Sequence, residues 1–130
     1  MNDITYHCKV IIDNDEEYAN AVDCLTTHVV SKVYHRFDGQ AYEDQKKARS
    51  YVLSTYIRRY VEEITDAAKE YFGKSPMAKE LLLGAIQEID FREISEDLIG
   101  DYSPKSTEEV AENEEFFNAM GFSNYDIDED

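Results

Sequence analysis

The sequence predicts an all-α or mostly α fold, a single compact domain of four or five helices with one candidate β-strand near the N-terminus. Three observations carry that prediction. Apolar residues recur at helical spacing along most of the chain. Capping residues and glycines divide this pattern into segments. A chain of 130 residues with 42% hydrophobic content is sufficient for one core. We expect the domain to span residues 1–123 and residues 124–130 to form an acidic tail.

The candidate strand covers residues 4–12, where hydropathy alternates. Ile4, Tyr6, Cys8, Val10 and Ile12 would lie on one side of an extended chain, which is typical of a half-buried strand. A single strand leaves both of its edges unpaired. The segment would therefore pair with another chain or with another part of this one, or it is instead the beginning of a helix.

Two longer helices are expected next. Asp13-Asn14-Asp15 is a capping cluster, and the apolar residues that follow it keep helical spacing until Gly39 ends the segment. A second helix of about thirty residues runs from near Ala41 to Phe72 and stops at Gly73. Its apolar stripe consists of Leu53, Ile57, Tyr60, Ile64, Ala67, Ala68 and Tyr71.

Three capping signatures divide the second half of the chain. Ser75-Pro76 predicts an N-cap followed by proline at the first helical position. Asp90, with Glu93 three residues later, resembles a capping box at the start of a short helix. Residues 106–109 form a further capping box, which leads into a last helix that ends at Gly121.

The charge of the chain is strongly acidic and unevenly distributed. It holds 29 Asp and Glu against 13 Lys and Arg, a formal net charge of −16. Direct binding to nucleic acid or to an anionic membrane is therefore disfavoured. Residues 101–130 hold ten acidic residues and only Lys105 as a base, a net charge of −9. Neither a signal peptide nor a membrane span is evident, and the two cysteines are consistent with a reducing cytoplasm, where we expect the protein to act.

Motifs of enzyme chemistry are weak or missing. Residues 68–75 match only the loosest phosphate-loop pattern, and they are expected to end a helix, where carbonyl groups face the wrong way for phosphate. Adjacent carboxylates such as Glu62 and Glu63 are turned about 100° apart on a helix, so they would not share a catalytic pocket. We expect no catalytic residues and no cofactor.

Cysteine and histidine offer one alternative chemistry. Cys24 and His28 are four residues apart on one helix face, a spacing that suits a shared metal ion. His7 and Cys8 would point to opposite sides of a strand, and no Cys-x-x-Cys pair occurs. The preferred interpretation is that Cys24 and His28 are packing residues, with no metal bound.

The last helix is the favoured candidate site. Glu108, Glu112 and Glu115 fall on one helical face, at about 5–6 Å between neighbours, a line of charge similar to that of a nucleic-acid strand. A protein surface that binds phosphates through Lys and Arg would be attracted to this line of carboxylates. The same acidic face is explained equally well if its role is only to keep the protein soluble. The expected partner-binding residues are Glu108, Glu109, Glu112, Glu115, Asp126 and Asp128.

A resemblance adds to this interpretation. The stretch from Glu80 to Ile99 resembles a helix–cap–helix segment of small acidic proteins from phages and mobile elements. Some of those proteins are anti-restriction or anti-CRISPR inhibitors that imitate DNA. The resemblance implies a non-enzymatic inhibitor that occupies the nucleic-acid groove of a host defence protein, with no contact residues to transfer.

The expected function is therefore that of an acidic binding protein, of the phage inhibitor type, which engages a basic nucleic-acid-binding protein and binds neither nucleic acid nor membrane. One alternative is a structural or adaptor module that forms a homodimer, through residues 4–12 or through its long helices. The second is a Cys/His metal-site protein.

Overall fold

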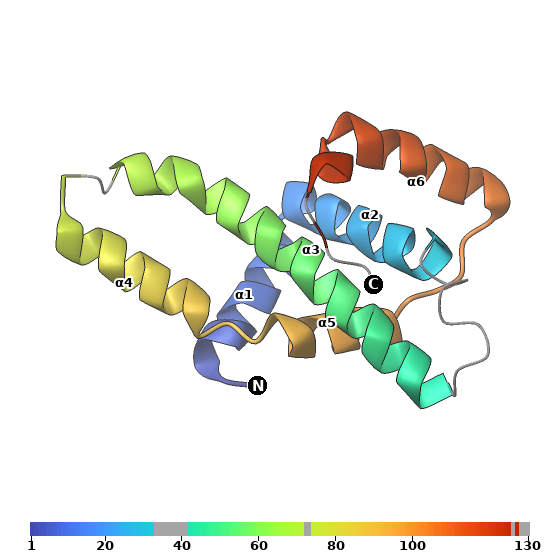
Figure 1. Cartoon of the computed structure of the whole chain (residues 1–130), viewed down its shortest axis with the longest axis horizontal. Helices are drawn as coiled ribbons and strands as arrows, with labels where there is room; N and C mark the ends of the chain where they lie inside the picture. Colours follow the sequence, from blue (N-terminus) through green and yellow to red (C-terminus); the bar gives the residue numbers. More distant parts are fainter. Residues whose placement is uncertain (33–41, 72–73, 126, 128–130) are drawn as a thin grey trace.

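The computed structural model describes residues 1–32, 42–71, 74–125 and 127. These residues contain six α-helices and a 3₁₀ helix, and no β-strand (Figure 1). The mostly α fold is confirmed, whereas the expected number of four or five helices is too low. The elements are α1 (Asp3–Asn14), α2 (Glu16–Lys32), α3 (Tyr42–Tyr71), α4 (Pro76–Gln87), α5 (Phe91–Gly100), α6 (Thr107–Ala119) and η2 (Phe122–Asn124).

The predicted N-terminal strand is wrong, because residues 4–12 lie within α1. Asn2 caps this helix, and its side-chain oxygen accepts a hydrogen bond from the Thr5 N–H at 2.8 Å. Ile4, Cys8 and Ile12 are four residues apart, so they share a helical face as well as one side of a strand. The alternating pattern therefore did not distinguish the two structures, and the alternative of a helix is the correct one.

The predicted N-caps of the later helices are confirmed. Each accepts a hydrogen bond from the backbone N–H three residues later: Asp15 at 3.2 Å, Ser75 at 3.3 Å, Asp90 at 3.1 Å and Ser106 at 3.1 Å. These bonds satisfy donors that the first turn of a helix leaves unpaired. At Asp90 the predicted capping box is only half formed, since Glu93 Oε1 lies 3.1 Å from the N-terminal amine instead. The predicted stops at positions 39 and 73 lie outside the described residues.

The core forms where α3 crosses α2 and α5 (Figure 1). Leu53 and Ile57 of the predicted α3 stripe are fully buried, as are Leu25 of α2 and Ile94 of α5. Each such side chain contributes about 1.5–3 kcal/mol by leaving water. The side chains at positions 67, 68 and 71 of the same stripe lie outside the description.

The chain turns back onto the core after α6. Gly121 has φ of 80°, a left-handed conformation that strains other residues, and it ends the helix as predicted. Phe122 is then buried, and Tyr125 and Ile127 pack against the core. The sequence predicts that the acidic tail begins at position 124. Tyr125 and Ile127 belong to that segment, so part of the predicted tail packs against the core. Residues 126 and 128–130 lie outside the described residues.

None of the described helices combines the length and the apolar composition that crossing a bilayer requires.

Candidate functional site

The candidate site is the outer face of α6, and its position depends on how that helix begins. The Ser106 hydroxyl accepts a hydrogen bond from the Glu109 N–H at 3.1 Å, and the Glu109 carboxylate accepts one from the Ser106 N–H at 3.3 Å. This reciprocal pair is the capping box that the sequence predicts. Glu108 and Glu109 also lie in the first turn, where the helix dipole favours negative charge.

The inner face of α6 packs along α2 (Figure 1). Phe117 is only 3% exposed, and its ring stacks on His28 with centroids 3.8 Å apart and planes 10° apart. The ring also contacts Tyr56 edge to face at 5.9 Å between centroids. Beside the stack, His28 Nδ1 lies 2.8 Å from Glu114 Oε1. One aromatic and one polar contact thus anchor the same turn of α6.

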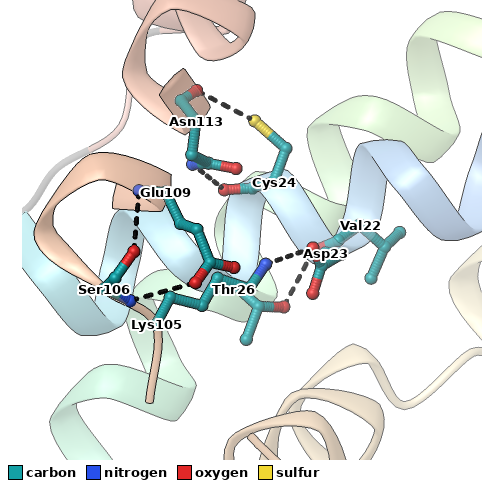
Figure 2. A network of polar contacts seen from close by, with 8 residues as sticks. All are labelled: Val22, Asp23, Cys24, Thr26, Lys105, Ser106, Glu109 and Asn113. Atoms are coloured by element: carbon teal, nitrogen blue, oxygen red, sulfur yellow. Dashed lines mark hydrogen bonds and ion pairs between the residues drawn. The ribbon is translucent and has the colours of Figure 1, made fainter. Parts of the chain in front are cut away.

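A second set of polar contacts anchors the first half of α6 (Figure 2). The Asn113 side-chain amide donates a hydrogen bond to the Cys24 carbonyl at 3.1 Å, and the Cys24 thiol donates one to the Asn113 carbonyl at 3.7 Å. Lys105, just before the helix, pairs with Asp23 of α2. Together with the His28 contacts, these bonds hold α6 at one rotation about its axis, which decides which carboxylates face outward.

The outward carboxylates are the ones that the sequence pattern selected. Glu108, Glu112 and Glu115 are all exposed on α6, and the helix contains no lysine or arginine. Glu109 is exposed as well, but its carboxylate also belongs to the capping box. The structure therefore places the four predicted α6 residues on one helix. The two predicted tail residues, Asp126 and Asp128, lie outside the described residues.

Glu114 is the acidic residue of α6 that was left out of the predicted site, and its carboxylate does face away from solvent toward His28. It is adjacent to Glu115 in the sequence, and one step along a helix is a rotation of about 100°. Periodicity alone therefore sorts the two neighbours correctly.

Two exposed apolar residues of α6 were not predicted as part of the site. Phe116 is 41% exposed and Met120 is 38% exposed, and they follow Glu112 at four-residue intervals. Phe117, which lies between them in the sequence, is buried instead. The four-residue spacing from Glu112 is the signal that could have assigned both to the outer face.

The Cys24 and His28 pair, the basis of the metal-site alternative, is engaged by protein groups. Burial, with the Glu114 and Asp23 carboxylates, raises the pKa of the Cys24 thiol to about 12. Metal binding and nucleophilic attack both require the thiolate, which this environment disfavours. His28 is occupied by its contacts with Glu114 and Phe117.

In the part of the chain that the structure describes, no three His, Cys, Asp or Glu residues are placed to hold a metal ion together. His7 and Cys8 lie on α1 and line an open groove of about 380 Å³ between α1, α3 and α4. The rest of this groove is almost entirely apolar, with Ile64 of α3 and Ile86 of α4 on its walls. Burial raises the pKa of the Cys8 thiol as well.

Comparisons with models of known protein families, with curated proteins and with solved structures found no match to this chain.

Proposed function

We propose that this chain is a non-enzymatic acidic binding protein whose outer α6 face engages the basic nucleic-acid-binding surface of another protein. The observation that carries this proposal is the row of exposed carboxylates on a helix that has no basic residue and whose opposite face is anchored to the core. An inhibitor of a host defence protein, of the kind that phages use, would act in this way.

The spacing of the charges suits such a partner. Residues three or four positions apart on the α6 face have Cβ atoms about 5–6 Å apart, so their carboxylates form a line of negative charge, as phosphates do along a nucleic-acid strand. A surface that binds phosphates with Lys and Arg can therefore pair with several of these carboxylates at once. The anchored inner face keeps them in a fixed line, which lowers the entropic cost of binding.

The arrangement also costs the helix stability. Glu108 and Glu112 are like charges four residues apart, a pairing that destabilises a helix by about 0.2–0.5 kcal/mol. Glu108 and Glu109 gain from the helix dipole in the first turn, but Glu112 and Glu115 lie beyond that turn and gain nothing from it. Solubility alone could be provided by charges placed elsewhere without the repulsion between Glu108 and Glu112, so the concentration on α6 favours a binding role.

Phe116 adds an apolar contact to the acidic face. Its ring is exposed beside Glu112, and aromatic residues at the centre of an interface provide much of its binding energy. The carboxylates would steer a basic partner to the face, and Phe116 would strengthen the final complex.

Both cysteines are free thiols, which agrees with action in a reducing cytoplasm.

The experiment that tests this proposal is a capture from bacterial host lysate at low and high salt, with and without duplex DNA as competitor. The immobilised protein should retain basic nucleic-acid-binding proteins at low salt, and both salt and DNA should release them. The test variant carries Glu108→Gln, Glu112→Gln and Glu115→Gln.

A matched control variant separates the position of the charges from their number. It carries Glu16→Gln, Glu70→Gln and Asp97→Asn, three exposed acidic residues on other helices. Both variants have the same net charge. Loss of capture in the α6 variant alone supports the proposal, and equal capture by both variants contradicts it.

A further inference from the structure

The groove between α1, α3 and α4 has the size of a small-molecule site. Its volume of about 380 Å³ lies within the range of about 300–1,000 Å³ that such sites have. Ile4 of α1, Ile64 of α3 and Leu82 of α4 belong to its lining, so apolar side chains border it on three helices. The groove therefore suits a ligand with an apolar body of limited size.

Two tyrosines line one part of this groove. Tyr18 comes from α2 and Tyr60 from α3, and their rings stand edge to face with 6.4 Å between centroids and 73° between planes. The face of an aromatic ring is partly negative and attracts a cation that lies within about 6 Å of its centre. The two rings therefore offer apolar surface and also favour a positive charge.

Carboxylates lie beside the two tyrosines. Asp15 Oδ1 is 3.2 Å from the Tyr18 backbone nitrogen, and Glu17 directly precedes Tyr18 in the first turn of α2. Burial, with the carboxylates of Glu17, Asp15 and Glu63, raises the pKa of the Tyr60 hydroxyl to about 12. These carboxylates produce a negative potential at the part of the groove where the rings lie.

No lysine or arginine lines the groove among the residues that the structure describes, and His7 is its one basic side chain. Lys9, the lysine of α1, pairs with Asp13 instead. The chain as a whole carries a net charge of −16, which raises the concentration of cations near its surface. The charges around the groove therefore select a cation over a neutral or anionic ligand of the same shape.

We propose that this groove binds small organic cations that have an apolar body, such as aromatic or alkyl ammonium and phosphonium ions. The apolar body occupies the space between α1, α3 and α4, and the positive centre lies toward Tyr18 and Tyr60. Removal of the apolar body from water supplies the affinity, while the rings and the carboxylates select the charge. No residue of α6 lines the groove, so the proposal does not depend on the function of the acidic face.

The test is isothermal titration calorimetry of the full chain with tetraphenylphosphonium and with tetraphenylborate, at about 0.15 M salt, where distant charges are screened. The two ions have nearly the same size and shape and opposite charges. The cation should bind with a Kd below about 100 µM, and the anion should bind at least about tenfold more weakly. Equal affinity for the two ions would overturn the proposal. So would an absence of cation binding, whether the groove is empty or a second copy of the chain covers it.

One pair of variants tests the source of the charge selection. Glu17→Gln should weaken cation binding about two- to fivefold, the effect of one exposed charge. The matched control is Glu16→Gln, which removes the same charge from the same exposed turn. Glu16 lies about 200° around the helix from Tyr18, so its loss should change the affinity less. Equal effects of the two substitutions would contradict the proposal.

A second pair of variants places the bound cation in the groove. Ala85→Phe puts a ring into the space that the ligand would occupy, and it should weaken cation binding at least about tenfold. Gln87→Phe adds the same ring to an exposed position of α4 outside the groove, and it should leave the binding unchanged. Cation binding that Ala85→Phe leaves intact would overturn the proposal. If Ala85→Phe does not fold, the comparison of Glu17→Gln with Glu16→Gln still decides.

Discussion

The His28 ring lies flat on the Phe117 ring, with 3.8 Å between centroids and 10° between planes. This contact joins α2 to α6 and fixes the rotation of the helix that carries the acidic face. The Glu114 carboxylate lies 2.8 Å from His28 Nδ1, so a polar contact between the same two helices accompanies the stack.

Replacing Phe117 should lower the free energy of unfolding more than any single substitution on the outer face of α6. Phe117→Ala removes a buried ring and its stack, so we expect a loss of about 3–5 kcal/mol in the free energy of unfolding, measured in urea. The adjacent Phe116→Ala is the matched control and should cost less than about 1 kcal/mol, because that ring is 41% exposed. Equal losses in the two variants would contradict the packing described for α6.

The capping box predicts a difference between two substitutions at the start of α6. Ser106→Ala removes the hydroxyl that accepts the Glu109 N–H, and it should cost about 1 kcal/mol of stability. Glu109→Gln retains an oxygen that can accept the Ser106 N–H, so its cost should be below about 0.5 kcal/mol. Urea denaturation of both variants measures this, and a larger loss in Glu109→Gln than in Ser106→Ala would be inconsistent with the observed bonds.

Alkaline pH should destabilise the fold through Cys24 and Tyr60. Burial, with nearby carboxylates, raises the pKa of each group to about 12, from ordinary values of 9.0 and 10.0. The stabilisation is complete below the ordinary values and is lost as pH rises toward 12. Each group should lower the free energy of unfolding by up to about 1.4 kcal/mol per pH unit in that window.

The variant Cys24→Ser isolates one of these two groups. Serine does not titrate in this range, and its hydroxyl can still donate to the Asn113 carbonyl. Urea denaturation between pH 8 and pH 11 should therefore show a shallower decline for the variant than for the wild-type chain. An unchanged decline would mean that the Cys24 thiol is not held in the protonated form.

Much of the fold follows from local signals in the sequence. Asp15, Ser75, Asp90 and Ser106 cap helices as their spacing predicts, because capping depends on residues only three positions apart. The exception is α1. Its apolar residues at every fourth position satisfy both a two-residue and a helical period, and Asn2 was the signal that could have decided between them.

Of the candidate site, the sequence could predict only the exposed carboxylates on the outer face of α6. Helical periodicity places Glu112 and Glu115 on one face, but it does not indicate what holds that face in position. The bonds between Cys24 and Asn113 join residues 89 positions apart, and the contact of His28 with Glu114 spans 86. Such long-range pairings depend on how the helices pack, which no local pattern in a single sequence encodes.

In the proposed function, the position of the α6 carboxylates, more than the total charge of the chain, produces binding. This is tested by measuring the Kd of the captured partner as a function of salt for the wild-type chain, the α6 triple variant and the control triple variant. We expect the α6 variant to bind about 10- to 100-fold more weakly and with a shallower salt dependence, because it loses three charge pairs of about 0.5–1 kcal/mol each. The control variant should keep nearly the wild-type affinity. Equal weakening in both variants would contradict the proposed role of the α6 face, since it would show that only the net charge matters.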